Sequence, residues 1–462
     1  MAKAIACHRV RMHAASTRSM TDVYRIAWPL GLKALMLHGI IVIDAYLISA
    51  LGEAALAAMG IAGAVAGLLL GILFAFSSAT QIRIAQSFGA SGAIGLKTAF
   101  YCGLAINLAS VLVGVVFVLA FGDTVITSAA KTPWIAEQAK AYLHVFLLVV
   151  FAEAVGQCLG SHFNGCGKTK ITFLSYLIAM PVNVGVSIIL IYGLYGAPEL
   201  GVVGAAYGSA MASLLRALFL ALRFHRLHRS FLDVEGWARG SFANSLKRHM
   251  AFSWPIAGTF LSMTFGTQVC VLIYARMSVN DFAAISLISP WVQVGGTFGM
   301  SWAQATGIVI AQMLGAKADE ATLDQFLSRA WRVAFAAAAV VALVYLVLCL
   351  ASPWIYDDLE AETQAALMLF LPTLLLLPFP KGSNAMCGQT LRAAGDTLSV
   401  MNIFIIGQWA FKVPMTVLFV LVLQLSVGWV FALYLLEELV KFPFFHRRLF
   451  KGQWKRADVD DR

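Results

Sequence analysis

Charged residues are scarce in this chain, at 12% of its 462 residues, whereas hydrophobic residues make up 60% and mean hydropathy is +0.81. Soluble domains carry roughly 25% charged residues, so a sizeable aqueous domain is excluded. Apolar runs such as 61–79 and 333–351 approach the roughly 20 residues that a helix needs to cross the hydrocarbon core. The sequence therefore predicts an all-α polytopic membrane protein.

Motifs of catalysis and ATP hydrolysis are also absent from the sequence. It contains no Walker-type phosphate loop, no Gly-x-Ser-x-Gly and no His-Glu-x-x-His. Its 7 cysteines form no Cys-x-x-Cys pair, which argues against a disulfide framework or a zinc site. We therefore expect neither an enzyme nor an ATP-driven pump, with no metal and no organic cofactor.

What the chain does contain is a series of apolar segments, and we predict twelve transmembrane helices, six in each half. Their predicted limits are 26–49, 55–83, 98–121, 139–163, 171–193, 202–223, 252–275, 284–310, 332–352, 366–390, 399–422 and 428–446. Each segment has the length of a membrane-spanning helix, and the long second and eighth segments are expected to tilt.

The two halves repeat each other. Trp28-Pro29 returns as Trp254-Pro255, and Ala85-Gln86 returns as Ala311-Gln312, both at an offset of 226 residues. A further pair, 167–169 and 395–397, lies at an offset of 228 residues. Landmarks at a near-constant offset indicate two pseudo-symmetric six-helix bundles, and such halves usually face each other across a substrate path.

Basic residues give the chain a net charge of +10, and their positions predict its orientation. If the N-terminus is cytoplasmic, the only basic residues outside are Lys131, Lys140 and Arg276. This is the positive-inside pattern, so we expect a multi-pass protein of the cytoplasmic membrane, with both termini in the cytoplasm. The lipid bilayer explains the basic character without a nucleic-acid partner.

The expected domain organisation follows from the spans and charges. We predict a basic cytoplasmic tail (1–22), an N-terminal bundle (23–223), a cytoplasmic linker (224–250), a C-terminal bundle (251–446) and a cytoplasmic tail (447–462). His225, His228 and His249 of the linker are expected to be solvated, because no carboxylate or cysteine shares their spacing. Residues 1–20 are typical of a flexible tail, of an upstream start before Met20, or of a transit peptide.

Three stretches of sequence carry a resemblance to a known family. They are Val42-Ile43-Asp44 with Ala50-Leu51-Gly52-Glu53, Pro181-Val182-Asn183 with Tyr192-Gly193, and Leu391-Arg392-Ala393-Ala394-Gly395-Asp396-Thr397. In their order and spacing over residues 20–450 they resemble the MATE (multidrug and toxic compound extrusion) family, NorM- and DinF-like members included. The resemblance implies two bundles forming a V that opens alternately to the two sides. It also implies antiport, in which an ion moves in and a small amphipathic, often cationic, organic compound moves out, and we expect a functional monomer.

Ionisable residues inside the spans are candidate functional residues, and Asp44 is the foremost. A carboxylate there is costly to ionise, so it can hold or lose a proton near neutral pH, as a proton-coupled carrier requires. It matches the family's coupling aspartate. Asn183 matches a family asparagine close to that aspartate, and Asn107 is a further candidate. Pro29 either kinks the first span or begins it. Helix–helix hydrogen bonding is the alternative role for these polar residues.

Candidate substrate contacts come from both halves. Glu153 and Gln157 share one face of the fourth span, and Lys381 is the repeat counterpart of Glu153. These two charges either pair or contact substrate, and Lys381 is expected to face water or an acid. Gln293 accompanies Trp291, Phe298, Met300 and Trp302, which could line an apolar pocket.

The departures from the NorM pattern concern the driving ion and the cargo. At the positions of the family's sodium-coupling acids stand Met263 and Lys381, so protons are the simpler driving ion, with sodium at Asp44 as the alternative. Lys381 also leaves an anionic or zwitterionic cargo open, as in a flippase or exporter of lipid-linked metabolites. Lys412 is expected to pair with Glu437 or Glu438 at the same depth.

Overall fold

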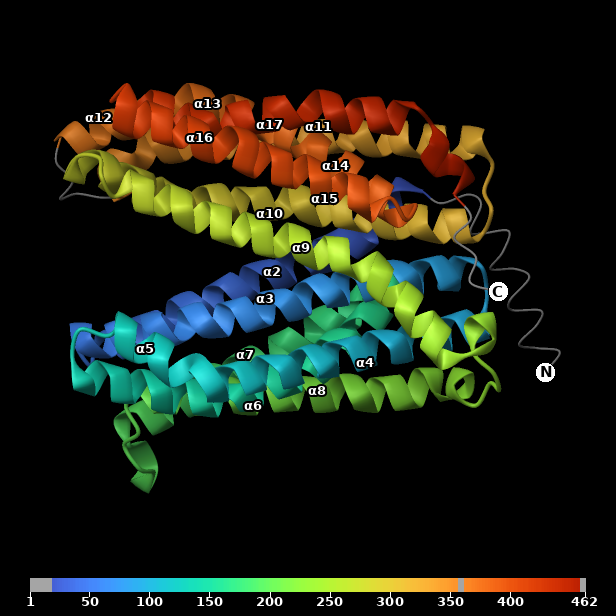
Figure 1. The fold of residues 1–462 in the computed structure, drawn as a ribbon, viewed down its shortest axis with the longest axis horizontal. Helices are drawn as coiled ribbons and strands as arrows, with labels where there is room; N and C mark the ends of the chain where they lie inside the picture. Colours follow the sequence, from blue (N-terminus) through green and yellow to red (C-terminus); the bar gives the residue numbers. More distant parts are fainter. Residues whose placement is uncertain (1–18, 356–360, 458–462) are drawn as a thin grey trace. The chain divides into compact units, whose positions relative to one another are not determined.

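The computed structural model describes residues 19–355 and 361–457, and within these ranges every regular element is a helix (Figure 1). The first half contains α2 (Met20–Ser49), α3 (Glu53–Gly89), α4 (Ala93–Phe117), η1 (Val118–Gly122), α5 (Asp123–Ala129), α6 (Pro133–Gly165), α7 (Thr169–Tyr192), η2 (Leu194–Gly196), α8 (Val202–Leu232) and η3 (Ala238–Gly240). The second half contains α9 (Phe242–Tyr274), α10 (Val279–Gly315), α11 (Glu320–Ile355), α12 (Ala361–Leu369), α13 (Leu371–Leu376), α14 (Pro378–Ala393), α15 (Thr397–Ile406), η4 (Gly407–Lys412), α16 (Val413–Val417), η5 (Leu418–Val422), α17 (Val427–Phe450) and η6 (Gln453–Arg456).

These helices occupy the twelve predicted spans. In the described residues, 9 helices are long and apolar enough to cross a membrane, and a bent pair that ends in α14 raises this to 10. The remaining two predicted spans are the more polar helices α10 and α17. The pair is bent by 44° between Leu376 and Pro378, where proline removes a backbone donor and interrupts the helix.

The helices repeat with the offset that the sequence shows. Helices α3 and α10 both contain 37 residues, and their first residues lie 226 positions apart. Helices α7 and α15 begin 228 positions apart. The copies differ most in the fourth span, which is the single helix α6 in the first half and the broken series α12, α13 and α14 in the second.

The chain divides into two compact units, which are described separately. The N-terminal unit comprises Leu32–Ala257, and the C-terminal unit comprises the described residues from Gly258 onward together with the start of α2, up to Gly31. Both boundaries lie two residues after a proline inside a helix, Pro29 in α2 and Pro255 in α9. Pro29 therefore lies within its helix and does not begin it.

The segment predicted as a solvated linker is largely helical. Helix α8 extends to Leu232 and α9 begins at Phe242. His249 is only 3% exposed, and its Nε2 lies 3.1 Å from Thr80 Oγ1 of α3. The expectation of a solvated His249 is therefore wrong, because the first turns of α9 pack on the N-terminal unit. His225 is exposed.

Close packing of α7 against α8 positions the polar residues of the N-terminal unit. A Cβ on Gly204 would lie 2.6 Å from the backbone of Leu190, and a Cβ on Gly208 would lie 2.9 Å from the carbonyl oxygen of Asn183. Only glycine permits such an approach of two helix backbones. The α7–α8 contact therefore places Asn183 beside the residue that follows Gly208, which is Ser209.

Candidate functional site

Asp44 is buried in the N-terminal unit, with 7% of its surface exposed. Its Oδ2 lies 3.5 Å from Ser209 Oγ, whereas its Oδ1 is buried without a hydrogen-bond donor. Ser209 Oγ accepts a hydrogen bond from Asn183 Nδ2 at 3.0 Å, which leaves the hydroxyl proton of Ser209 for Asp44. In the described part of the chain, no basic side chain lies within 4.0 Å of Asp44. Asp44 is thus a buried acid that is not committed to a cation.

The structure brings Asn183 to Asp44 but places Asn107 elsewhere. Asn183 and Asp44 share the hydroxyl of Ser209, and Asn183 Oδ1 is also buried without a donor. Asn107 Nδ2 donates to Ser77 Oγ at 2.9 Å and to the carbonyl of Ala154 at 3.3 Å. Asn107 therefore ties α4 to α3 and α6, the helix–helix role that was the alternative for it.

Glu153 of α6 forms an ion pair with Arg216 of α8, with Arg216 Nη2 donating to Glu153 Oε2. Gln157, one helical turn from Glu153, donates to the same oxygen at 2.8 Å and to Tyr176 Oη at 3.3 Å. The guanidinium of Arg216 also lies 4.5 Å from the centre of the Tyr176 ring. Gly156 leaves the room for this arginine, because a Cβ there would lie 2.8 Å from Arg216 Nη2.

A second cation joins this group. Lys33 of α2 is 8% exposed, and its Nζ lies 5.5 Å from the ring centre of Phe74 and 5.2 Å from that of Tyr176. Such distances suit a cation–π interaction, which partly replaces lost hydration. The group therefore holds two buried cations, Lys33 and Arg216, for the single carboxylate of Glu153, and the Nε and Nη1 of Arg216 have no hydrogen-bond acceptor.

The C-terminal unit holds a denser charged cluster on α17. Glu437 pairs with Lys412 at 2.8 Å and with Lys441 at 3.1 Å, and Lys441 also pairs with Glu438 at 2.8 Å. The expected pairing of Lys412 with a glutamate of the last span is confirmed. Asn384 Nδ2 donates to Glu438 Oε2 at 2.7 Å, so each of the four carboxylate oxygens has a donor.

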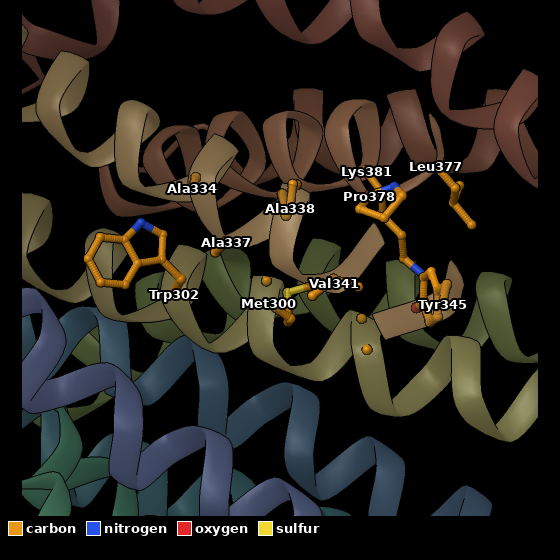
Figure 2. Close-up of a pocket in the computed structure, with 15 residues that line it drawn as sticks. Met300, Trp302, Ala334, Ala337, Ala338, Val341, Tyr345, Leu377, Pro378 and Lys381 are labelled. Carbon is orange, nitrogen blue, oxygen red and sulfur yellow. The ribbon is translucent and has the colours of Figure 1, made fainter. Parts of the chain in front are cut away.

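Lys381 of α14 lines a cavity of about 50 Å³ between α10, α11 and α14 (Figure 2). Gly295, Gly296 and Gly299 form its floor on α10, and a Cβ on Gly296 would lie 3.3 Å from Lys381 Nζ. Figure 2 shows Lys381 and Tyr345 at one end of the cavity and Trp302 at the other. Among the described residues that line this cavity, Lys381 is the one that carries a charge.

The other predicted substrate contacts divide between this cavity and its surroundings. Met300 and Trp302 line it, whereas Gln293 and Met263 do not. The side chain of Gln293 is exposed, and that of Met263 is 37% exposed. Helix α10 turns its glycines toward the cavity, so Gln293 falls on another face.

Sequence reasoning missed four residues of these polar groups: Lys33, Ser209, Arg216 and Lys441. Three of them are basic residues inside or at the end of predicted spans, where any charge signals function or pairing. A systematic search of each span for charges would have found them. Ser209 gives no such signal, since serines are common in membrane helices.

Comparison with known proteins agrees with the repeat. The sequence model of the MatE family matches residues 29–189 and 255–418, two segments whose first residues are 226 positions apart. The uncharacterized transporter YisQ of Bacillus subtilis is 22% identical over 446 residues, covering 94% of each chain. The probable multidrug resistance protein NorM of Streptococcus pneumoniae strain R6 is 26% identical over 318 residues, covering 68% of this chain and 69% of its own.

Solved structures show the same fold. A MOP superfamily transporter from Pyrococcus furiosus aligns with a TM-score of 0.83 at 19% identity, over 96% of this chain and 98% of that chain. A mutant of the Vibrio cholerae MATE transporter VcmN aligns with a TM-score of 0.81 at 17% identity, over 96% of this chain and 99% of that chain. The prediction of an all-α polytopic membrane protein with twelve helices in two six-helix halves is therefore confirmed.

Proposed function

We propose that this chain, which belongs to the MatE family of membrane transporters, exports small amphipathic organic compounds. In exchange, the carrier takes up protons that bind Asp44. Members of this family are multi-pass membrane carriers and not enzymes. The cargo class follows relatives such as NorM of Streptococcus pneumoniae, which is named a probable multidrug resistance protein. The driving ion and the site belong to the proposal.

The single observation that carries the proton assignment is the isolation of Asp44. It is buried, its Oδ1 has no donor, and its Oδ2 has only the hydroxyl of Ser209 at 3.5 Å. A carboxylate in such surroundings gains stability when it takes up a proton, because the neutral form needs no counter-charge. Glu153, by contrast, is held ionised by Arg216 and is unsuited to reversible protonation.

Protonation of Asp44 would act through the helices that meet there. The neutral acid gains a proton that it can donate, so it no longer requires the hydroxyl proton of Ser209. The ionised acid instead draws the hydroxyl proton of Ser209. The two protonation states thus favour different hydrogen-bond arrangements of α2, α7 and α8. A proton taken up on one side of the membrane can bias the carrier toward the opposite access state.

Sodium is the second candidate ion, favoured by the same oxygens. The unpartnered Oδ1 atoms of Asp44 and Asn183, together with Ser209 Oγ, are hard ligands of the kind that bind alkali and alkaline-earth cations. The C-terminal unit offers no such site at the repeat position of Asp44, since Cys270 stands there with its Sγ 3.7 Å from Thr416 Oγ1. Either ion is therefore assigned to the N-terminal unit.

The test is transport in vesicles under imposed gradients. With purified protein in lipid vesicles, a pH gradient at equal sodium concentration should drive the transport of an amphipathic dye. Asp44→Asn should abolish this gradient-driven transport. Cys270→Ser, at the repeat position, is the matched control and should retain it. A sodium gradient that drives exchange at constant pH would assign the ion to sodium. Full driven exchange in Asp44→Asn would refute the assignment of Asp44.

The same proposal includes the orientation and the oligomeric state. Basic residues are concentrated near both termini and in the loops that follow the second, fourth, sixth, eighth and tenth spans. This distribution supports a protein of the cytoplasmic membrane with both termini in the cytoplasm. The proposal also includes a functional monomer with no metal and no organic cofactor. Cysteine labelling from outside the cell, after single cysteines are placed in the loops of a cysteine-free variant, tests the orientation.

A further inference from the structure

The charged cluster of the C-terminal unit has one lysine more than it has carboxylates. Lys412 and Lys441 take both oxygens of Glu437, and Lys441 and Asn384 take both oxygens of Glu438. Lys381 is the third lysine, and in the described residues no carboxylate lies within 4.0 Å of its Nζ. An ammonium without a counter-ion is strongly penalised in a membrane interior, so this position calls for an anion that the chain does not supply.

The cavity beside Lys381 has the shape of a head-group site. Its volume of about 50 Å³ has room for a few water molecules or for an acidic group of similar size. Gly295 and Gly296 create this space, because side chains there would meet Tyr345 Oη at 2.3 Å and Lys381 Nζ at 3.3 Å. A Cβ on Gly299 would meet no atom within 4 Å, which marks an open end.

The rest of the lining suits an apolar body. Met300, Trp302, Ala337, Ala338 and Val341 line the cavity away from Lys381 and present carbon, sulfur and an indole ring. The indole Nε1 of Trp302 already donates to the carbonyl of Ala330 at 3.0 Å, so its ring is held in place as an apolar surface. The cavity thus combines one positive charge at one end with apolar contacts toward the other, which is the pattern of an anionic amphiphile.

We propose that Lys381 binds the acidic head group of the cargo in this cavity, and that the physiological cargo is a small organic anion with an apolar body. This inference rests on the proposed exporter function and adds the charge of its substrate. A lone ammonium repels cationic compounds and attracts anionic ones.

The test compares three probes that share one ring system and differ in charge. 1-Naphthalenesulfonate is anionic, 1-naphthalenesulfonamide is its neutral isostere, and 1-naphthylmethylammonium is cationic. Equilibrium binding to the purified full-length chain and uptake into vesicles are measured for each probe. We expect the anion to bind at least about tenfold more tightly than the amide, the strength of a charge-assisted hydrogen bond.

Variants of Lys381 test whether this residue causes the preference for the anionic probe. Lys381→Met keeps the length of the side chain, removes the charge and should abolish the preference, whereas Lys381→Arg should retain it. Lys33→Met is the matched control, because it removes another buried lysine that has no carboxylate within 4.0 Å in the described residues and that does not line the cavity. An anion preference that survives Lys381→Met, or a wild-type chain that prefers the cation, would overturn the proposal. Size-exclusion profiles verify that each variant is folded.

This experiment distinguishes failure of the proposed Lys381 site from failure of the proposed proton coupling at Asp44. Asp44→Asn should retain the anion preference in equilibrium binding and lose gradient-driven uptake of every probe. Lys381→Met should retain gradient-driven uptake of the neutral probe. Gradient-driven uptake that survives Asp44→Asn, beside an unchanged anion preference in binding, would refute the proton-coupled function and leave the Lys381 site standing.

Discussion

The two halves of this carrier differ in charge at two pairs of repeat positions. The N-terminal unit has a free acid, Asp44, where the C-terminal unit has Cys270 at the repeat position. The C-terminal unit has Lys381 without a carboxylate partner at the repeat position of Glu153, which is paired. One half thus holds a group suited to a proton, and the other holds a group suited to an anion.

The paired charges around these two groups explain why they remain uncommitted. In the N-terminal unit, Arg216 of α8 neutralises Glu153. In the C-terminal unit, Lys441 occupies the matching place on α17 and engages both glutamates of that helix. Each of these ion pairs therefore lies within one unit. Asp44 and Lys381 take no part in these ion pairs, so they are available to a mobile ion and to cargo. Substitutions can test this difference between the two units.

The largest effect on stability is expected from removing the carboxylate of the Glu153–Arg216 ion pair. Glu153→Gln leaves the 2% exposed Arg216 without a counter-charge, which should cost about 3–5 kcal/mol of stability. Arg216→Met should cost less, because Glu153 keeps the hydrogen bond from Gln157 and lies near Lys33. Thermal unfolding of the purified variants in detergent measures both.

The double variant Glu153→Gln with Arg216→Met is the control for this pair. It removes both charges and should recover most of the stability that Glu153→Gln loses, since no buried charge is left uncompensated. If Glu153→Gln unfolds at the temperature of the unaltered chain, the pair is not structural. Glu153 would then belong with the uncommitted charges, and the contrast between the halves would fail.

The next effect is on the voltage dependence of export. If one organic anion leaves for each proton that enters, two positive charges move inward per cycle, whereas a neutral cargo moves one. Each charge contributes about 2.3 kcal/mol per 100 mV, equivalent to about fiftyfold in steady-state accumulation. Export of 1-naphthalenesulfonate should therefore respond more steeply to an inside-negative potential than export of its amide.

Vesicles clamped with potassium and valinomycin at several potentials provide this measurement. Equal voltage dependence for the two probes would mean that the anion is not carried as an anion, and the assignment of Lys381 would lose its functional basis. Lys381→Met in the same vesicles should leave the response of the amide unchanged, which separates the selectivity of one half from the coupling of the other.

The sequence predicts most of the fold, and it predicts those features that depend on local composition. Span positions follow from apolar runs, the repeat follows from landmarks at a constant offset, and the Lys412–Glu437 pair follows from equal depth in adjacent antiparallel helices. Asp44 could be singled out because an acid in an apolar helix is conspicuous whatever surrounds it.

Features that depend on which helix faces meet could not be predicted. The partner of Glu153 is set by the approach of α6 to α8, where Gly156 makes room for the arginine. The burial of His249 follows from the packing of the first turns of α9 against Thr80. The hydroxyl between Asp44 and Asn183 depends on the close contact of α7 with α8 at Gly208.

A moderate effect is expected from filling the glycine floor of the cavity. Gly295 stands on α10 at the repeat position of Leu69 on α3, so the C-terminal unit has a gap where the other unit has a side chain. Gly295→Ala would place a methyl group 2.3 Å from Tyr345 Oη, which donates to the carbonyl of Val292. We expect a loss of about 1–3 kcal/mol in thermal unfolding.

Gly67→Ala on α3 is the matched control for this substitution. A Cβ on Gly67 meets no atom within 4 Å, so only the backbone preference changes, and a gain of about 0.4–1 kcal/mol is expected. A gain in both variants would show that Tyr345 moves freely, and that the cavity is not held open by the glycines.

The smallest effect is expected at the start of the third span, where the halves also differ. Helix α11 begins beside Asp319, whose Oδ2 accepts from the backbone N–H of Thr322 at 2.9 Å and whose Oδ1 accepts from its hydroxyl at 2.7 Å. Helix α4 of the N-terminal unit begins after Gly92, which has no capping side chain. Asp319→Ala should therefore lower the unfolding temperature, by at most about 2 °C because the site is exposed.

The pH dependence of this effect has a definite sign. The two hydrogen bonds from Thr322 hold the pKa of Asp319 below its ordinary value, so its contribution is present above that value and is lost as the pH falls through the lowered pKa. The difference in unfolding temperature between the unaltered chain and Asp319→Ala should accordingly shrink on acidification from pH 7 to below about 4. Gly92→Asp should create the same pH-dependent gain at α4. A difference that grows on acidification would show that Asp319 stabilises the helix as the neutral acid, and the capping contrast between the two halves would then be wrong.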